Sequence, residues 1–161
     1  MSATTANAPA GVARLREHLA SASPSEHFYV TLLGLSTFET VALHDRVGAG
    51  LSYRALERVR QALDVSTSEL ADYIWVSILT LARRREAKRL QPDESDRLLR
   101  LTRIVGLALR LFEGDLSPAR RWLRTPNAAL GDEAPLRMAT TEVGAREVEH
   151  LIGRLEHGIP L

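Results

Sequence analysis

The stretch "STSELADYIWVSILTLARRREAKRLQPDES" spans residues 66–95 and contains three signals for helix starts in close succession. Ser66 and Glu69 have the spacing of a capping box, in which each side chain binds the other residue's backbone amide. Ser77 can cap a second helix that runs through the arginines to about residue 89. Pro92 suits the first position of a third helix, with an acidic cluster near its positive end. Residues 66–95 therefore predict short helices joined by tight turns.

The residues before this stretch predict two further helices. Ser36 and Glu39 have capping-box spacing, and the helix that they open is expected to stop near the glycines at 48–50. Ser52 is expected to cap a helix whose apolar residues fall on one face, namely Leu56, Val59 and Leu63. Short helices with tight connections, the last of them basic, are the outline of a helix-turn-helix domain.

The residues after Pro92 also follow helical spacing. An apolar stripe of period three to four continues to Gly114 through Leu98, Leu101, Val105, Ala108 and Phe112. Ser117-Pro118 is expected to start a short helix, a turn-rich connection follows, and a final helix is expected over roughly Glu142 to His157. Strand-like alternation is absent over any useful length, so we expect an all-α fold.

Composition limits the classes of protein. The chain has 161 residues, 45% of them hydrophobic and 25% charged, which is ordinary for a globular protein. It contains no cysteine, which excludes disulfides and thiolate chemistry. We find neither a transmembrane run nor a secretion signal, so we expect a cytoplasmic protein that does not bind membranes. Residues 1–29 are expected to form a flexible arm, with a short helix near Val12–Leu19.

Positive charge is concentrated in the middle of a nearly neutral chain. Residues 83–110 carry nine basic against four acidic residues, net +5, within a total of +1. Such a block can act as an electrostatic footprint for nucleic acid. At the leading end of the helix we expect base reading by Ser77, Thr80 and Arg84. We expect further DNA contacts from the cations Arg83, Arg85, Lys88 and Arg89. The alternative is a solvated face that the acidic residues nearby neutralise.

Catalytic chemistry is not indicated. The five histidines, at positions 18, 27, 44, 150 and 157, lack metal-ligand spacing. Most serines are explained as helix caps, and the acidic residues after Pro92 suit a helix N-terminus better than an acid–base pair. We therefore expect no enzyme activity, no cofactor and no metal.

Five irregular motifs in one order resemble the Xre/MbcA/ParS-type antitoxins of RES–Xre toxin–antitoxin pairs. They are "TLARR" at 80–84, "ESDRLLRL" at 94–101, "ARRWLRTPN" at 119–127, "LG…PL" at 130–136 and "GAREVEHLIGRLEHG" at 144–158. The resemblance runs from about Leu32 to Gly158. It implies a helix-turn-helix DNA-binding module at 30–91 and a toxin-binding domain at 92–161.

The resemblance also implies function. Such antitoxins bind operator DNA as dimers, and they neutralise an NAD-consuming RES toxin by occluding its active site. One departure concerns the turn before the basic helix: relatives often have a glycine there, whereas this chain has Trp75 and Val76. Because a left-handed turn position disfavours bulky residues, we expect a turn of another shape.

Candidate toxin contacts lie in three places along the second half. Trp122 and Arg124 lie in the "ARRWLRTPN" motif, where a core role for Trp122 is the alternative. Leu130, Leu136 and Arg137 lie in a turn-rich segment that we expect to be exposed. The terminal residues, expected to insert beside the toxin's cleft or to fold back as a cap, are His157, Gly158, Ile159, Pro160 and Leu161.

Two other functions remain compatible with the residues. One is a stand-alone helix-turn-helix repressor without a toxin partner. The other is a helical protein-interaction module whose basic face is only solvated.

Overall fold

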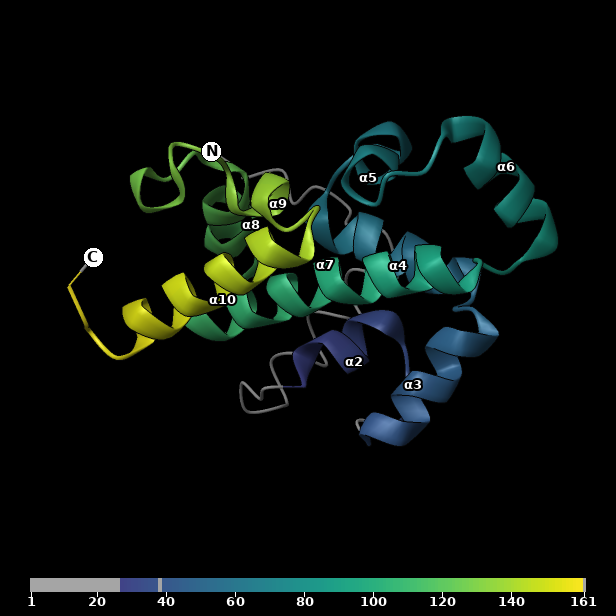
Figure 1. Ribbon diagram of the computed structural model, residues 1–161, viewed down its shortest axis with the longest axis horizontal. Coiled ribbons are helices and arrows are strands. Elements are labelled where there is room, and N and C mark those ends of the chain that lie inside the picture. The colour runs from purple at the N-terminus through teal and green to yellow at the C-terminus, as the bar shows by residue number, and fades with distance from the viewer. Residues whose placement is uncertain (1–26, 38, 161) are drawn as a thin grey trace, which may run out of the picture.

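A 20-residue helix, α7, runs through the middle of the molecule, and α2, α3, α4, α8 and α10 pack against it (Figure 1). The computed structural model describes residues 27–37 and 39–160, so the predicted arm and its helix near 12–19 lie largely or wholly outside the described residues. Along the chain the helices are α2 (Phe28–Leu33), α3 (Thr40–Ala49), α4 (Tyr53–Leu63), α5 (Thr67–Tyr73), α6 (Ile78–Ala87), α7 (Pro92–Leu111), α8 (Leu116–Arg124), η1 (Ala128–Leu130), α9 (Pro135–Met138) and α10 (Glu142–Glu156). The described residues form no β-strand, and the predicted all-α fold is confirmed.

The caps predicted for α4, α5 and α6 are confirmed. Ser66 Oγ accepts the Glu69 amide at 3.1 Å, and Glu69 Oε2 accepts the Ser66 amide at 2.9 Å. Ser52 and Ser77 accept the Ala55 and Thr80 amides in the same way. These short-range bonds satisfy amides that a helix start leaves without partners, which is why the serines mark the boundaries.

The turn between α5 and α6 differs from the expectation. Trp75 has φ 53°, a left-handed conformation, so the prediction of another turn shape is wrong. The Val76 amide donates to the Ala71 carbonyl at 3.0 Å and the Trp75 amide donates to Asp72 at 3.3 Å. This is the Schellman pattern that glycine usually completes. The Trp75 side chain projects into solvent, 64% exposed, where its bulk meets no obstacle.

Other boundaries also differ. The capping box expected at Ser36 is absent, because α3 begins at Thr40 and its N-cap residue Glu39 makes no side-chain cap bond. Helix α6 ends at Ala87 rather than near residue 89, since Lys88 adopts φ 58°. Helix α8 begins at Leu116, capped by Asp115, and not at the predicted Ser117-Pro118. Helix α2 has no counterpart among the predicted helices.

The two halves of the chain share one apolar core. Buried leucines of α4, α5 and α7 belong to the same cluster as Val148, Leu151 and Ile152 of α10. Helix α10 lies alongside α7 (Figure 1), and ion pairs join them at 2.6 Å (Arg103–Glu149) and 2.7 Å (Arg110–Glu156). No helix in the described part of the chain has both the length and the apolar composition needed to cross a membrane.

Gly106 allows α2 to pack closely against α7. A Cβ built on Gly106 of α7 would lie 2.9 Å from the Tyr29 backbone nitrogen of α2, whereas a Cβ on Gly153 of α10 would meet nothing within 4 Å. Both glycines lie inside helices, where alanine is intrinsically favoured.

The two substitutions are therefore expected to have opposite signs. We expect Gly106→Ala to lower the free energy of unfolding by about 1–3 kcal/mol, because α2 must shift. We expect Gly153→Ala to raise it by up to about 1 kcal/mol. Urea denaturation followed by circular dichroism measures both, and a stabilising Gly106→Ala would contradict the described contact.

Candidate DNA-binding and partner-binding surfaces

Helix α6 presents an outward face that begins with apolar side chains. Leu81 is buried and anchors the helix to the core. At 100° per residue, Leu79 and Arg83 lie opposite Leu81, and Glu86 follows on the same face. Leu79 is 64% exposed and Ile78 is 50% exposed, while α6 lies at an edge of the molecule (Figure 1). The exposed start of this helix is thus apolar, whereas polar base-reading residues were predicted there.

The residues predicted to read bases are engaged within the fold. Ser77 Oγ accepts the Thr80 amide, and the hydroxyls of Ser77 and Thr80 are 2.9 Å apart. Arg84 donates two hydrogen bonds to the Glu94 carboxylate of α7, from Nε to Oε2 at 2.8 Å and from Nη2 to Oε1 at 3.0 Å. The hydrogen bond to Glu94 raises the pKa of Arg84. The structure therefore gives Arg84 a part in joining α6 to α7, which is a correction of the expected base-reading position.

The remaining cations predicted to contact DNA are exposed, and two of the four, Arg85 and Arg89, make side-chain contacts within the fold. Arg89 donates to the Ala49 and Gly50 carbonyls at 3.0 and 2.9 Å, so it also joins the end of α3. Arg85 lies with its guanidinium carbon 5.7 Å from the centre of the Tyr53 ring, and its hydrogen bond with Tyr53 raises its pKa. The side chains of Arg83 and Lys88 make no hydrogen bond or ion pair with the described residues.

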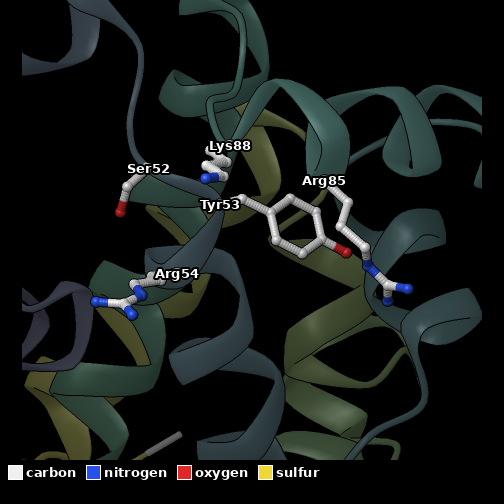
Figure 2. A pocket seen from close by; sticks show the side chains of 5 residues that line it. All are labelled: Ser52, Tyr53, Arg54, Arg85 and Lys88. Atoms are coloured by element: carbon white, nitrogen blue, oxygen red, sulfur yellow. The ribbon is translucent and has the colours of Figure 1, made fainter.

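A basic hollow lies between the start of α4 and the end of α6. Figure 2 shows the Tyr53 hydroxyl directed at Arg85, with Arg54 and Lys88 on either side of the Tyr53 backbone. The hollow is lined by Ser52, Tyr53, Arg54, Arg85 and Lys88, and none of these is acidic. Three cations in the lining favour an anion such as a phosphate, although the charges of Glu57 and Glu86 also act on Arg85. Arg54 was not among the predicted DNA contacts, although its position two residues after the Ser52 cap places it at the start of α4.

The predicted partner contacts in the 119–138 region point inward or toward the first half. Leu130 and Leu136 are buried, so the expectation that this segment exposes them is wrong. Trp122 is half-buried and packs against Phe112 with ring centres 6.4 Å apart, which agrees with its alternative, a core role. Their burial follows from two short helical turns, η1 and α9, which pack the connection against the core.

Arg124 and Arg137 both contact α5. Arg124 Nη2 lies 3.0 Å from Glu69 Oε1, and the Arg137 guanidinium carbon lies 5.0 Å from the Tyr73 ring centre. Hydrogen bonds to the Ser66 backbone and side chain lower the pKa of Glu69, and the charges of Arg124 and Arg137 lower it further. The second half thus holds the first helix of the helix-turn-helix unit from two points.

The chain end projects from the opposite end of the molecule from α6 (Figure 1). Gly158 has φ 63°, and the Ile159 amide donates to the Arg154 carbonyl at 3.0 Å, which closes α10. Ile159 remains 53% exposed and Pro160 is exposed, while Leu161 lies outside the described residues. His157 is exposed, and its Nδ1 lies 2.7 Å from the Gly153 carbonyl. The terminal residues are available to a partner.

Comparison with known proteins matches both halves. Residues 42–103 match the family model for the antitoxin Xre-like helix-turn-helix domain, and residues 107–158 match that for the antitoxin Xre/MbcA/ParS C-terminal toxin-binding domain. The models meet inside α7, whereas the predicted boundary lay at its first residues.

Relatives that match two thirds or more of the chain carry the name Antitoxin Xre. The protein of Yersinia enterocolitica is 34% identical over 128 residues, covering 79% of this chain and 86% of the relative. That of Photorhabdus laumondii is 33% identical over 111 residues, covering 68% and 75%. That of Pseudomonas putida is 32% identical over 120 residues, covering 74% of each.

The buried Glu94 carboxylate is expected to matter for stability, unlike its neighbour Asp93. Glu94 accepts from Arg84 and from the Gln91 amide at 2.8 Å, whereas Asp93 is exposed and pairs with Arg97 along the helix. We expect Glu94→Ala to lower the free energy of unfolding by roughly 1–3 kcal/mol, because buried donors lose their acceptor. Asp93→Ala, the matched control, should change it by less than about 0.5 kcal/mol. Equal effects in urea titrations would contradict this difference.

Proposed function

The chain belongs to the Xre family of antitoxins, and from this premise we propose that it neutralises a RES-domain toxin and represses its own operon. The family is one of antitoxins with a helix-turn-helix domain and not one of enzymes. The observation that carries the proposal is the presence of both family domains, in order, in one chain. We propose that the two activities divide at the start of α7, with operator binding in residues 30–91, toxin binding in 92–161 and an arm at 1–29.

The DNA half of the proposal is supported by charge and exposure. Helix α6 projects its outward face from the edge of the molecule, and Arg83 and Lys88 are exposed on or beside it. The hollow that contains Arg54 and Arg85 adds an anion site next to this helix. One such helix reads only a half-site, so we propose that a homodimer binds a two-fold operator in the cytoplasm.

The toxin half is supported by the chain end. Ile159 and Pro160 are exposed apolar residues beyond the last helix, on a segment that leaves α10 free to keep its packing against α7. We propose that this segment enters the cleft of an NAD-consuming RES toxin and blocks its active site. Residues 119–138 then act mainly by supporting the domain, since Leu130, Leu136 and Trp122 pack on the core.

Neutralisation is tested by growth. Expression of the neighbouring open reading frame alone should arrest cells, and the full chain should relieve the arrest. A chain that stops after His157 should fail to relieve it, while its melting temperature stays within about 2 °C, because the removed residues 158–160 are exposed. Val41→Asp, which changes an exposed side chain of α3, serves as the control and should rescue fully.

A harmless neighbour would favour the alternative function, a repressor without a toxin partner. Full rescue by the shortened chain would instead place the neutralising surface elsewhere in residues 92–161.

Operator binding is tested by its salt dependence on a duplex from the region upstream of the gene. The logarithm of the binding constant should fall linearly with the logarithm of salt concentration. Arg83→Ala and Lys88→Ala should each weaken binding and reduce the slope by about one. Arg146→Ala, at an exposed arginine of α10, should leave the slope unchanged. Binding that lacks salt dependence, or no binding, would support the protein-interaction module.

A further inference from the structure

An apolar patch covers the start of the exposed face of α6. It consists of Trp75 in the turn and Ile78 and Leu79 in the first turn of the helix, with exposed fractions of 64%, 50% and 64%. Ile78 and Leu79 are adjacent in the first turn of α6, and the small residue Ala82 follows them at spacings of four and three, while Trp75 lies in the turn two residues before the Ser77 cap. Other exposed large apolar side chains in the described residues, such as Val41 and Val143, lie on α3 and α10.

The backbone conformation of Trp75 lowers the stability of the turn. Trp75 occupies the left-handed position of the turn, which disfavours a residue with a Cβ by about 1–2 kcal/mol relative to glycine. Its ring gains little from burial in return, because it is mostly exposed. A strained residue whose side chain faces solvent suggests a function in binding.

The charges around the patch indicate its partner. Arg83 continues the outward face one turn after Leu79, and Arg85 and Lys88 lie beyond it. A second copy of the chain docked by two-fold symmetry would bring these cations close to their own equivalents. Duplex DNA, in contrast, offers phosphates to the cations at the rim of the major groove. Inside the groove it offers one apolar group on a base edge, the thymine 5-methyl group.

We infer that Trp75, Ile78 and Leu79 determine operator specificity by packing against thymine methyl groups in the major groove. This inference rests on the proposed operator binding and names the chemical group that the helix reads. It is also consistent with the engagement of Ser77, Thr80 and Arg84 within the fold, because base discrimination is then carried by apolar contact. Glu86, on the same face, suits the groove floor, where the cytosine amino group donates, better than the phosphates.

The test replaces thymine by deoxyuridine, which removes only the methyl group. A duplex of the region upstream of the gene is footprinted with the full chain, and each thymine in the protected site is replaced in turn. Replacement of a contacted thymine should weaken binding about fourfold, the contribution of one buried methyl or methylene group. Thymines outside the footprint provide the baseline and should have no effect.

The side chain and the methyl group are then paired in a double-mutant cycle. Leu79→Ala should weaken binding to the thymine duplex by roughly fourfold to tenfold and abolish the difference between thymine and deoxyuridine at one position. Val41→Ala, an equally exposed apolar side chain on α3, is the matched control and should change neither. If the loss of affinity from Leu79→Ala and the loss from deoxyuridine add independently at every thymine, the inference is overturned.

Trp75→Gly separates the patch from the fold. Because glycine relieves the left-handed strain, the melting temperature should rise by about 2–4 °C while operator affinity falls. Unchanged affinity would exclude Trp75 from the reading surface. Sedimentation equilibrium of Leu79→Ala tests whether a second copy of the chain covers the patch instead of DNA. If the variant no longer dimerises but keeps its operator affinity, the patch belongs to the dimer interface and the inference is overturned.

Failure of operator binding itself is distinguishable. A wild-type chain that binds no duplex, modified or not, removes both the proposed operator binding and the inference. A chain that binds with normal salt dependence but ignores deoxyuridine removes the inference alone.

Discussion

The carboxylate of Glu94, buried at the start of α7, is the contact that sets the position of α6. It accepts from Arg84 on α6 and from the Gln91 amide in its own capping box, so one side chain both starts α7 and holds the preceding helix. The Leu51 amide, bound to Ser95 Oγ at 2.8 Å, attaches the start of α4 to the same turn. Because α7 continues into the second half, this single corner relates the orientation of α6 to the whole core.

The second half is built to stabilise the first. Arg120 donates to the Ala62 and Gln61 carbonyls at the end of α4, at 2.6 and 3.0 Å, and thereby satisfies acceptors that a helix end leaves open. Arg124 and Arg137 hold α5 in a similar way. Arg124 and Arg137 were expected to face a partner, yet their contacts lie within the chain. The three arginines therefore connect the second half of the chain to α4 and α5.

Local features of the fold were predictable, and features that depend on distant packing were not. The caps at Ser52, Ser66 and Ser77 involve residues at most three positions apart, so their spacing was a sufficient signal. The same spacing at Ser36 produced no cap, because α3 starts later and neighbouring packing determines where. Burial of Leu136 and the pairing of Arg84 with Glu94 join segments whose approach no local pattern reveals.

The outward face of α6 could have been predicted from the sequence by starting from its buried residue, Leu81, and not from its basic residues. Counting basic residues selected Arg83, Arg84 and Arg85 alike, whereas taking Leu81 as the buried anchor singles out Leu79 and Arg83 on the opposite side. Charge alone marks the basic run, and it does not say which side of α6 faces away from the core. In a short helix held at one side by a single leucine, geometry determines which side chains can enter a groove, and charge determines only how strongly the helix is drawn toward it.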